Sequence, residues 1–126
     1  MIIRPATDAD GAALATLIAE TFAEYPGCLF LDAEFPELQA PASHYARAGG
    51  RLFVAEHEAG LVGSLAVAAT AVPGVAELFK VYSAAGLRGS GLAQRLYAEG
   101  EALARAGGAR EIVLWSDTRF TRGHRF

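Results

Sequence analysis

Hydrophobic positions along the first fifty residues predict a short strand followed by one clear helix. The strand is expected over residues 2–5 and should end at the proline, which cannot donate a backbone hydrogen bond. Apolar residues then recur at helical spacing as far as Phe22. This helix is expected to stop before the Tyr-Pro-Gly sequence at 25–27. Residues 28–50 show no regular period, apart from a short helix expected near 42–48.

The middle of the chain predicts a meander of consecutive strands joined by tight turns. Strands are expected over residues 51–56, 61–70 and 75–82. Glycine and proline residues mark the turns between them. In the last of these strands, simple alternation places Phe79 and Val81 on one face and Leu78 on the other.

A second strong helix and a final strand complete the predicted order of elements. One helical face carries four small or apolar residues: Leu92, Leu96, Gly100 and Leu103. Gly107 is expected to end this helix, and residues 112–115 predict a strand. The order predicts a single α/β domain over residues 1–126, with a mixed, mostly antiparallel central sheet, flanking helices and one crossover.

Composition adds the class of protein and its compartment. Hydrophobic residues make up 52% and charged residues 20% of the 126 residues, so a packed core is expected. The single cysteine, Cys28, excludes an intrachain disulfide. No apolar run reaches membrane-spanning length, and the N-terminus lacks the order of a signal peptide. We therefore expect a cytoplasmic protein without a membrane partner.

Charge is divided unequally between the two halves of the chain. Residues 1–63 contain three basic and nine acidic residues, whereas residues 64–126 contain eight basic and five acidic residues. Charge alone favours an ordinary solvated surface, although such a division also suits a partner with anionic and cationic parts. The basic residues form no dense run, so nucleic acid is not an expected partner. The histidines, at 44, 57 and 124, lack ligand spacing, so no metal is expected.

A loop of small residues between a predicted strand and a predicted helix carries the clearest chemistry. Its residues are Arg88, Gly89, Ser90, Gly91, Leu92 and Ala93. The first amides of a helix lack an intrahelical acceptor, and glycines let a phosphate approach them. The P-loop and dinucleotide fingerprints fit poorly, because no lysine follows the glycines and Gln94 stands where a third small residue belongs. The residues alone leave two alternatives: a pyrophosphate site, or a tight turn capped by Ser90.

The spacing Arg88-x-x-Gly91-x-Ala93 resembles the acetyl-CoA signature of the GNAT family of N-acetyltransferases. The context strengthens this resemblance. The opening around Arg4, the strand at 76–82 and the strand and loop at 114–120 resemble the corresponding parts of such chains. The resemblance covers nearly the whole chain, and it implies an acyl-CoA N-acyltransferase-like fold.

The resemblance implies that acetyl-CoA is the cosubstrate and that a primary amine attacks its thioester directly. The loop residues 88–93 would present amides to the pyrophosphate, and Arg95 or Arg125 would meet the remaining phosphate. The strand end would pair its backbone with the pantetheine arm through Val81, Tyr82 and Ser83. No protein nucleophile is needed, so Cys28 is expected to be a buried or incidental thiol.

Catalysis also needs a group that takes the proton of the amine. Glu77, on the strand that lines the expected slot, is our first choice, and an ion pair with Lys80 or an arginine is its alternative. Glu24 and Tyr25 are expected to bind the acceptor, in an acceptor-side lid over residues 20–47. The acid for the leaving thiolate, often a tyrosine in this family, is expected beyond residue 126, since Tyr82 would compete with core packing.

The chain departs from the family pattern at its end. The resemblance implies a further helix and strand after residue 126, so we expect a C-terminally truncated domain whose open sheet edge favours a homodimer. The leading function is an N-acetyltransferase acting on a small-molecule or peptide amine. The alternatives are a non-catalytic acyl-CoA-binding regulatory module and a purely structural domain.

Overall fold

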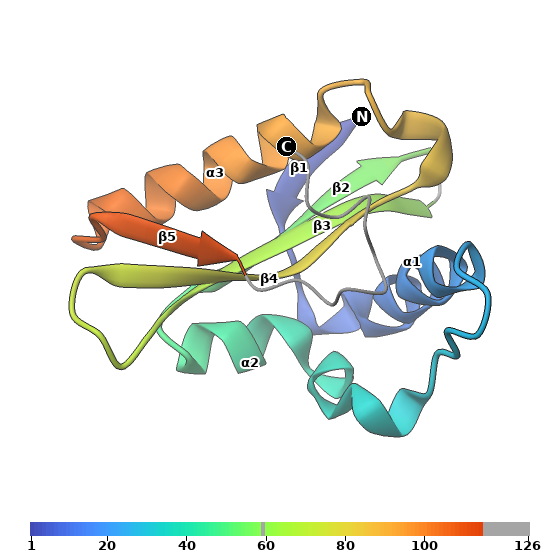
Figure 1. The fold of residues 1–126 in the computed structure, drawn as a ribbon, viewed down its shortest axis with the longest axis horizontal. Helices are drawn as coiled ribbons and strands as arrows, with labels where there is room; N and C mark the ends of the chain where they lie inside the picture. The colour runs from blue at the N-terminus through green and yellow to red at the C-terminus, as the bar shows by residue number, and fades with distance from the viewer. Residues whose placement is uncertain (59, 115–126) are drawn as a thin grey trace.

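A mixed sheet runs through the centre of the computed structural model, which describes residues 1–58 and 60–114 (Figure 1). Within these residues the strands are β1 (Ile2–Pro5), β2 (Arg51–His57), β3 (Gly60–Ala69), β4 (Val75–Ser83) and β5 (Glu111–Leu114). They lie side by side in chain order, β1-β2-β3-β4-β5. Neighbouring strands are antiparallel except β4 and β5, which are parallel and joined by a crossover.

Helices cover both faces of the sheet. The α-helices of the described residues are α1 (Gly11–Ala23), α2 (Pro41–Arg47) and α3 (Leu92–Ala106). Single 3-10 turns are η1 (Asp8–Asp10), η2 (Asp32–Glu34), η3 (Pro36–Gln39) and η4 (Ala85–Leu87). Figure 1 shows α3 on one face and α1 and α2 on the other. The predicted order of elements is confirmed, and the expected α/β fold with it.

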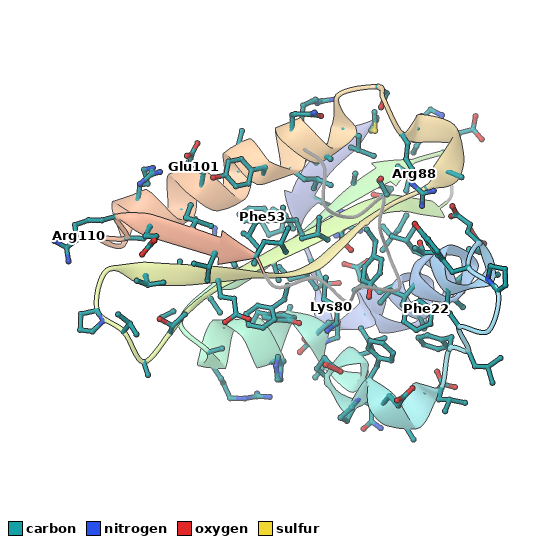
Figure 2. The ribbon with its side chains drawn as sticks, viewed as in Figure 1. Phe22, Phe53, Lys80, Arg88, Glu101 and Arg110 are labelled. Carbon is teal, nitrogen blue, oxygen red and sulfur yellow. The ribbon has the colours of Figure 1, made fainter. Side chains whose placement is uncertain are left out.

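Alternation along β2 divides the core into two halves. Leu52 and Val54 pack with α1 and α2, whereas Phe53 packs with Leu92 and Leu96 of α3. Figure 2 shows Phe53 on the α3 side of the sheet. A strand covered on both faces has no polar alternation, which is why residues 52–55 form a continuous hydrophobic run.

The predicted facing of β4 is wrong because the strand contains a bulge. Ser64 of β3 lies opposite Tyr82, and Ala66 lies opposite Phe79, so β4 carries one extra residue over this stretch. Phe79 consequently packs on the α1 and α2 side, while Val81 shares the α3 side with Leu78. Alternation from sequence alone cannot detect an inserted residue, and it therefore misplaced Val81.

Arg4 ties the beginning of the chain to the sheet and to the first helix. Its guanidinium donates to both carboxylate oxygens of Asp10, at 2.9 and 3.0 Å, and to Glu56 of β2 at 3.2 Å. These hydrogen bonds raise the pKa of Arg4, with Asp10 as the main cause. A bidentate pair with this geometry fixes the direction in which the chain leaves β1 and enters α1.

Gly50 allows α2 and β2 to join at a place where backbones meet. A Cβ on this residue would lie 1.7 Å from the carbonyl oxygen of Val67 in β3. Backbone atoms of a central strand cannot give way, so we expect Gly50→Ala to lower the free energy of unfolding by at least about 2 kcal/mol. Gly60→Ala is the matched control, because its Cβ would meet nothing within 4 Å. Urea denaturation of both variants tests this, and equal stabilities would contradict the packing described.

Asp10 makes stability depend on pH. Arg4 holds the pKa of the Asp10 carboxyl below its ordinary value. A lowered pKa stabilises the fold above the unfolded value, about 3.9, and this contribution is lost as the pH falls. We expect Asp10→Asn to cost about 1–2 kcal/mol at pH 7, and the difference from wild type to shrink below about pH 4. Urea denaturation at several pH values measures this difference in stability. Glu99→Gln, at an exposed position, is the control, and its stability should equal that of the wild type at every pH.

Candidate functional site

The loop between β4 and α3 has the backbone geometry of an anion site. Gly89 and Gly91 adopt left-handed conformations, with φ of 82° and 89°, and Gly91 is the residue that caps α3. Ser90 accepts a 3.4 Å hydrogen bond from the amide of Leu92. In the described part of the chain, the amides of Gly89, Gly91, Ala93 and Gln94 donate no backbone hydrogen bond outside the helix. The start of α3 therefore offers donors and the positive end of its dipole.

The open sides of the two glycines fit the phosphates that the resemblance implies. A Cβ at Gly89 or at Gly91 would meet no protein atom within 4 Å. On this side of the two glycines the described residues leave room for a diphosphate to approach the backbone. Gly91, not Ser90, is the residue that caps α3, although the hydroxyl of Ser90 accepts from the amide of Leu92. The tight turn and the pyrophosphate site are compatible, because a capped helix still has first-turn amides without intrahelical acceptors.

Arg88 is held in place by two elements rather than projecting freely. Its guanidinium binds the carboxylate of Glu24 through both terminal nitrogens, one of them at 2.9 Å, and donates to the carbonyl of Ser83 at 3.0 Å. Glu24 raises the pKa of Arg88. Figure 2 shows Arg88 between the loop and α1. The pair brings together a residue predicted for the cosubstrate and a residue predicted for the acceptor.

The bulge in β4 centres on Lys80, which has a φ of 52°. Positive φ is unfavourable for a residue with a side chain, so its surroundings must hold it. The hydroxyl of Ser64, fully buried on β3, donates a 2.7 Å hydrogen bond to the Lys80 carbonyl. This bond satisfies a carbonyl that the regular ladder would have used.

The edge of β4 beyond Leu78 is where the pantetheine segment was predicted. Within the described residues, β5 pairs with β4 from Val75 to Leu78, and β3 covers the other edge as far as Ser83. The predicted residues Val81, Tyr82 and Ser83 are half-buried, and they follow the bulge directly. Tyr82 packs against the core on the α1 and α2 side, as expected of a side chain that competes for core space.

Lys80 and Glu37 form an ion pair beneath this part of the sheet. The Lys80 ammonium lies 3.3 Å from Oε2 of Glu37, which stands on η3. The rings of Phe35 and Tyr45 lie on either side, 5.4 and 5.9 Å from the ammonium nitrogen. Burial, with the charge of Glu37, raises the pKa of Tyr45. Figure 2 shows Lys80 on the α1 and α2 side of the sheet.

Glu77 lies on the same face of β4, before the bulge. It is half-buried, opposite Ala68 of β3 and Val113 of β5. Within residues 1–58 and 60–114 it forms no ion pair, and Lys80 binds Glu37 instead. The alternative that paired Glu77 with Lys80 is therefore wrong. The alternative that paired it with an arginine finds no such pair among the described residues.

The remaining predicted residues are spread over the structure. Tyr25 is half-buried against the core, and Cys28 is a buried free thiol, as expected. Arg95 is exposed on α3. Arg125 and His124 lie outside the described residues, as does the rest of 115–126. Among the residues that are described, no three metal-ligand side chains gather, and no helix is long and apolar enough to cross a membrane.

The sequence did not predict the Lys80–Glu37 pair or the Ser64 hydroxyl, and it did not predict the Arg88–Glu24 pair or the bulge in β4. The Lys80–Glu37 pair joins residues 43 positions apart, across a segment without regular period. One signal pointed to it, since Lys80 is the only lysine of the chain and stands in an apolar strand. Nothing in the sequence distinguished Ser64 from an ordinary strand serine.

Comparisons with known proteins agree with this geometry. An acetyltransferase of the GNAT family from Staphylococcus aureus has a TM-score of 0.86 at 16% identity, over 98% of this chain and 78% of that chain. An acetyltransferase from Streptococcus agalactiae has a TM-score of 0.83 at 23% identity, over 98% and 77%. A GNAT family acetyltransferase from Brucella melitensis, in complex with acetyl-CoA, has a TM-score of 0.69 at 25% identity, over 99% and 81%.

Comparison of the sequence, rather than of the fold, identifies the family of the chain. None of the curated proteins matches it. The profile of the acetyltransferase (GNAT) family, however, matches residues 12–126, which include both the loop at 88–93 and the bulged strand. A match over most of the chain, on the fold and loop described above, shows that the protein belongs to the GNAT acetyltransferase family.

Proposed function

We propose that this protein transfers the acetyl group of acetyl-CoA to a primary amine of a small molecule or peptide. The observation that carries the proposal is the loop at 88–93, where Gly89, Gly91 and Ala93 have amides without a backbone acceptor among the described residues. A Cβ on either glycine would meet nothing within 4 Å. Family membership supports acetyl transfer, and the Brucella melitensis relative holds acetyl-CoA.

Different segments of the chain would bind different parts of the cosubstrate acetyl-CoA. Gly89, Gly91 and Ala93 would hold the pyrophosphate through backbone amides, because these lie at the positive end of α3. The amide of Ser90 already donates to the carbonyl of Leu87, so Ser90 would contribute its hydroxyl. Residues 81–83 would pair with the pantetheine arm as an added strand. Arg88 contributes charge to this site while its carboxylate partner Glu24 fixes its direction.

Glu77 is the proposed proton acceptor. An ammonium has no lone pair, so the amine gives a proton to the carboxylate before its nitrogen bonds to the thioester carbonyl carbon. The carbon–sulfur bond then breaks, and the thiolate leaves and takes up a proton. Cys28 is buried and takes no part in this direct attack. Glu24 and Tyr25, at the end of α1, are the proposed acceptor-side contacts.

We expect Gly91→Val to abolish the binding of CoA while leaving a folded protein. A side chain at this φ of 89° is strained, and it would occupy the side from which the phosphates approach. Gly108→Val is the matched control, because Gly108 follows the other end of α3 with a φ of 99° and equally open surroundings. Both variants should lose about 1–2 kcal/mol of stability. Calorimetry with CoA should show loss of affinity for Gly91→Val alone, and unchanged affinity there would overturn the phosphate assignment.

We expect Glu77→Gln to lower kcat about 10²- to 10⁴-fold, because the amide cannot take the proton of the amine. The affinity for CoA should stay unchanged, since Glu77 lies before the bulge and away from the loop. Thiol release from acetyl-CoA with a panel of amines gives kcat, and calorimetry gives the affinity. A protein that binds CoA but releases no thiol with any amine would instead be a non-catalytic acyl-CoA-binding module.

A further inference from the structure

The Lys80–Glu37 ion pair is buried, and its contribution to stability does not explain its presence. The side chains are only 11% and 17% exposed, so both charges have lost most of their water. An ion pair this buried gains little stability over apolar residues of the same size, because desolvation offsets the attraction. A role in stability is therefore a weak explanation for the chain's only lysine standing in an apolar strand.

The pair is also incomplete as a set of hydrogen bonds. Oε1 of Glu37 is buried and has no hydrogen-bond partner among residues 1–58 and 60–114. Leaving a buried acceptor without a donor is unfavourable, and native proteins contain few such atoms. On the other side, the Lys80 ammonium donates one hydrogen bond, to Oε2 of Glu37, and its described surroundings are otherwise the Phe35 and Tyr45 rings. Oε1 of Glu37 can therefore accept a further hydrogen bond, and the Lys80 ammonium can donate more than one.

Its position relates it to the proposed reaction. Lys80 is the bulge residue, between the part of β4 that β5 pairs and the proposed pantetheine segment at 81–83. Glu77 stands on the same face, three residues earlier. The pair lies on the face opposite α3, among the side chains of the α1 and α2 side. With the pantetheine arm on residues 81–83, as proposed above, an acceptor approaching from this face of the sheet would come near Glu37 and Lys80.

The charges of the pair indicate what kind of acceptor fits. Because Glu37 and Lys80 together are neutral, an amine with one positive charge gains little from them. A molecule with an ammonium and a carboxylate on one carbon satisfies both, with its ammonium on Oε1 of Glu37 and its carboxylate on the Lys80 ammonium. Resting on the proposed acetyl transfer, we propose that the Lys80–Glu37 pair binds the α-amino and α-carboxylate groups of a free amino acid, whose amino group is acetylated.

Binding requires a small rearrangement, since Oε1 is covered by protein in this structure. Glu37 stands on η3, a single turn of four residues between α1 and α2. Such a turn is a small unit to displace. Acetylation replaces the ammonium by an amide, so the product loses the charge that Glu37 recognises and should dissociate.

The first test compares acceptors that differ in one group. Thiol release from acetyl-CoA is measured with each proteinogenic amino acid, its amide and the amine that lacks the carboxylate. We expect the best amino acid to exceed its amide and its amine about 10- to 100-fold in kcat/KM, because the amide and amine leave Lys80 without its partner. Lys80→Met should reduce this ratio to near 1, and Lys80→Arg should restore part of it.

The second test measures binding, which does not depend on turnover. Calorimetry of the protein–CoA complex with the best amino acid, or with all of them if none is turned over, should show binding to wild type and none to Glu37→Gln. Since breaking a buried pair can unfold the protein, the double variant Glu37→Gln/Lys80→Met provides a neutral replacement. Arg105→Met is the matched control, because it breaks the exposed Arg105–Glu101 pair on α3 and should leave binding unchanged.

The outcomes separate this inference from the proposed function. Turnover of amines without preference for the carboxylate, or a preference that survives Lys80→Met, overturns the amino-acid site and leaves acetyl transfer standing. Absence of thiol release with every amine, despite CoA binding, contradicts acetyl transfer. In that case amino-acid binding that Glu37→Gln removes still supports the site, and absence of such binding overturns it.

Discussion

One extra residue in β4 is the constraint on which the rest of the site depends. Without the bulge at Lys80, alternation would turn the side chains of both Lys80 and Tyr82 towards α3. With it, Phe79 and Lys80 point to the same face, and the strand edge beyond them is re-aimed. The hydroxyl of the buried Ser64 binds the carbonyl of Lys80, so a side chain satisfies a backbone group that the bulge removes from the ladder.

The fold follows from the sequence because its signals are local. The period of apolar residues gave α1 and α3, proline and glycine gave their ends, and a continuous apolar run gave β2. The loop at 88–93 was also readable, since its chemistry needs only neighbouring residues. The order of elements predicted that β5 lies parallel in the sheet, because a crossover helix joins it to the preceding strand.

The rest of the site was not predictable, because it depends on contacts between distant residues. The Arg88–Glu24 pair spans 64 positions and joins residues assigned to separate roles. The bulge depends on register, which no periodicity reports, and it reversed the predicted facing of Val81. Asp8 illustrates the same limit, because its carboxylate accepts hydrogen bonds from Ser43 in α2, 35 positions away.

The parallel pairing of β4 with β5 has a consequence for the order in which the chain folds. Strands β2, β3 and β4 are joined by short turns, so their contacts close small loops and can form early. The β4–β5 pairing must wait until the intervening helix has folded, because it closes a much longer loop. The loop at 88–93, proposed above to bind the pyrophosphate, lies inside that connection. The meander of β2, β3 and β4 can therefore form before the proposed binding site does.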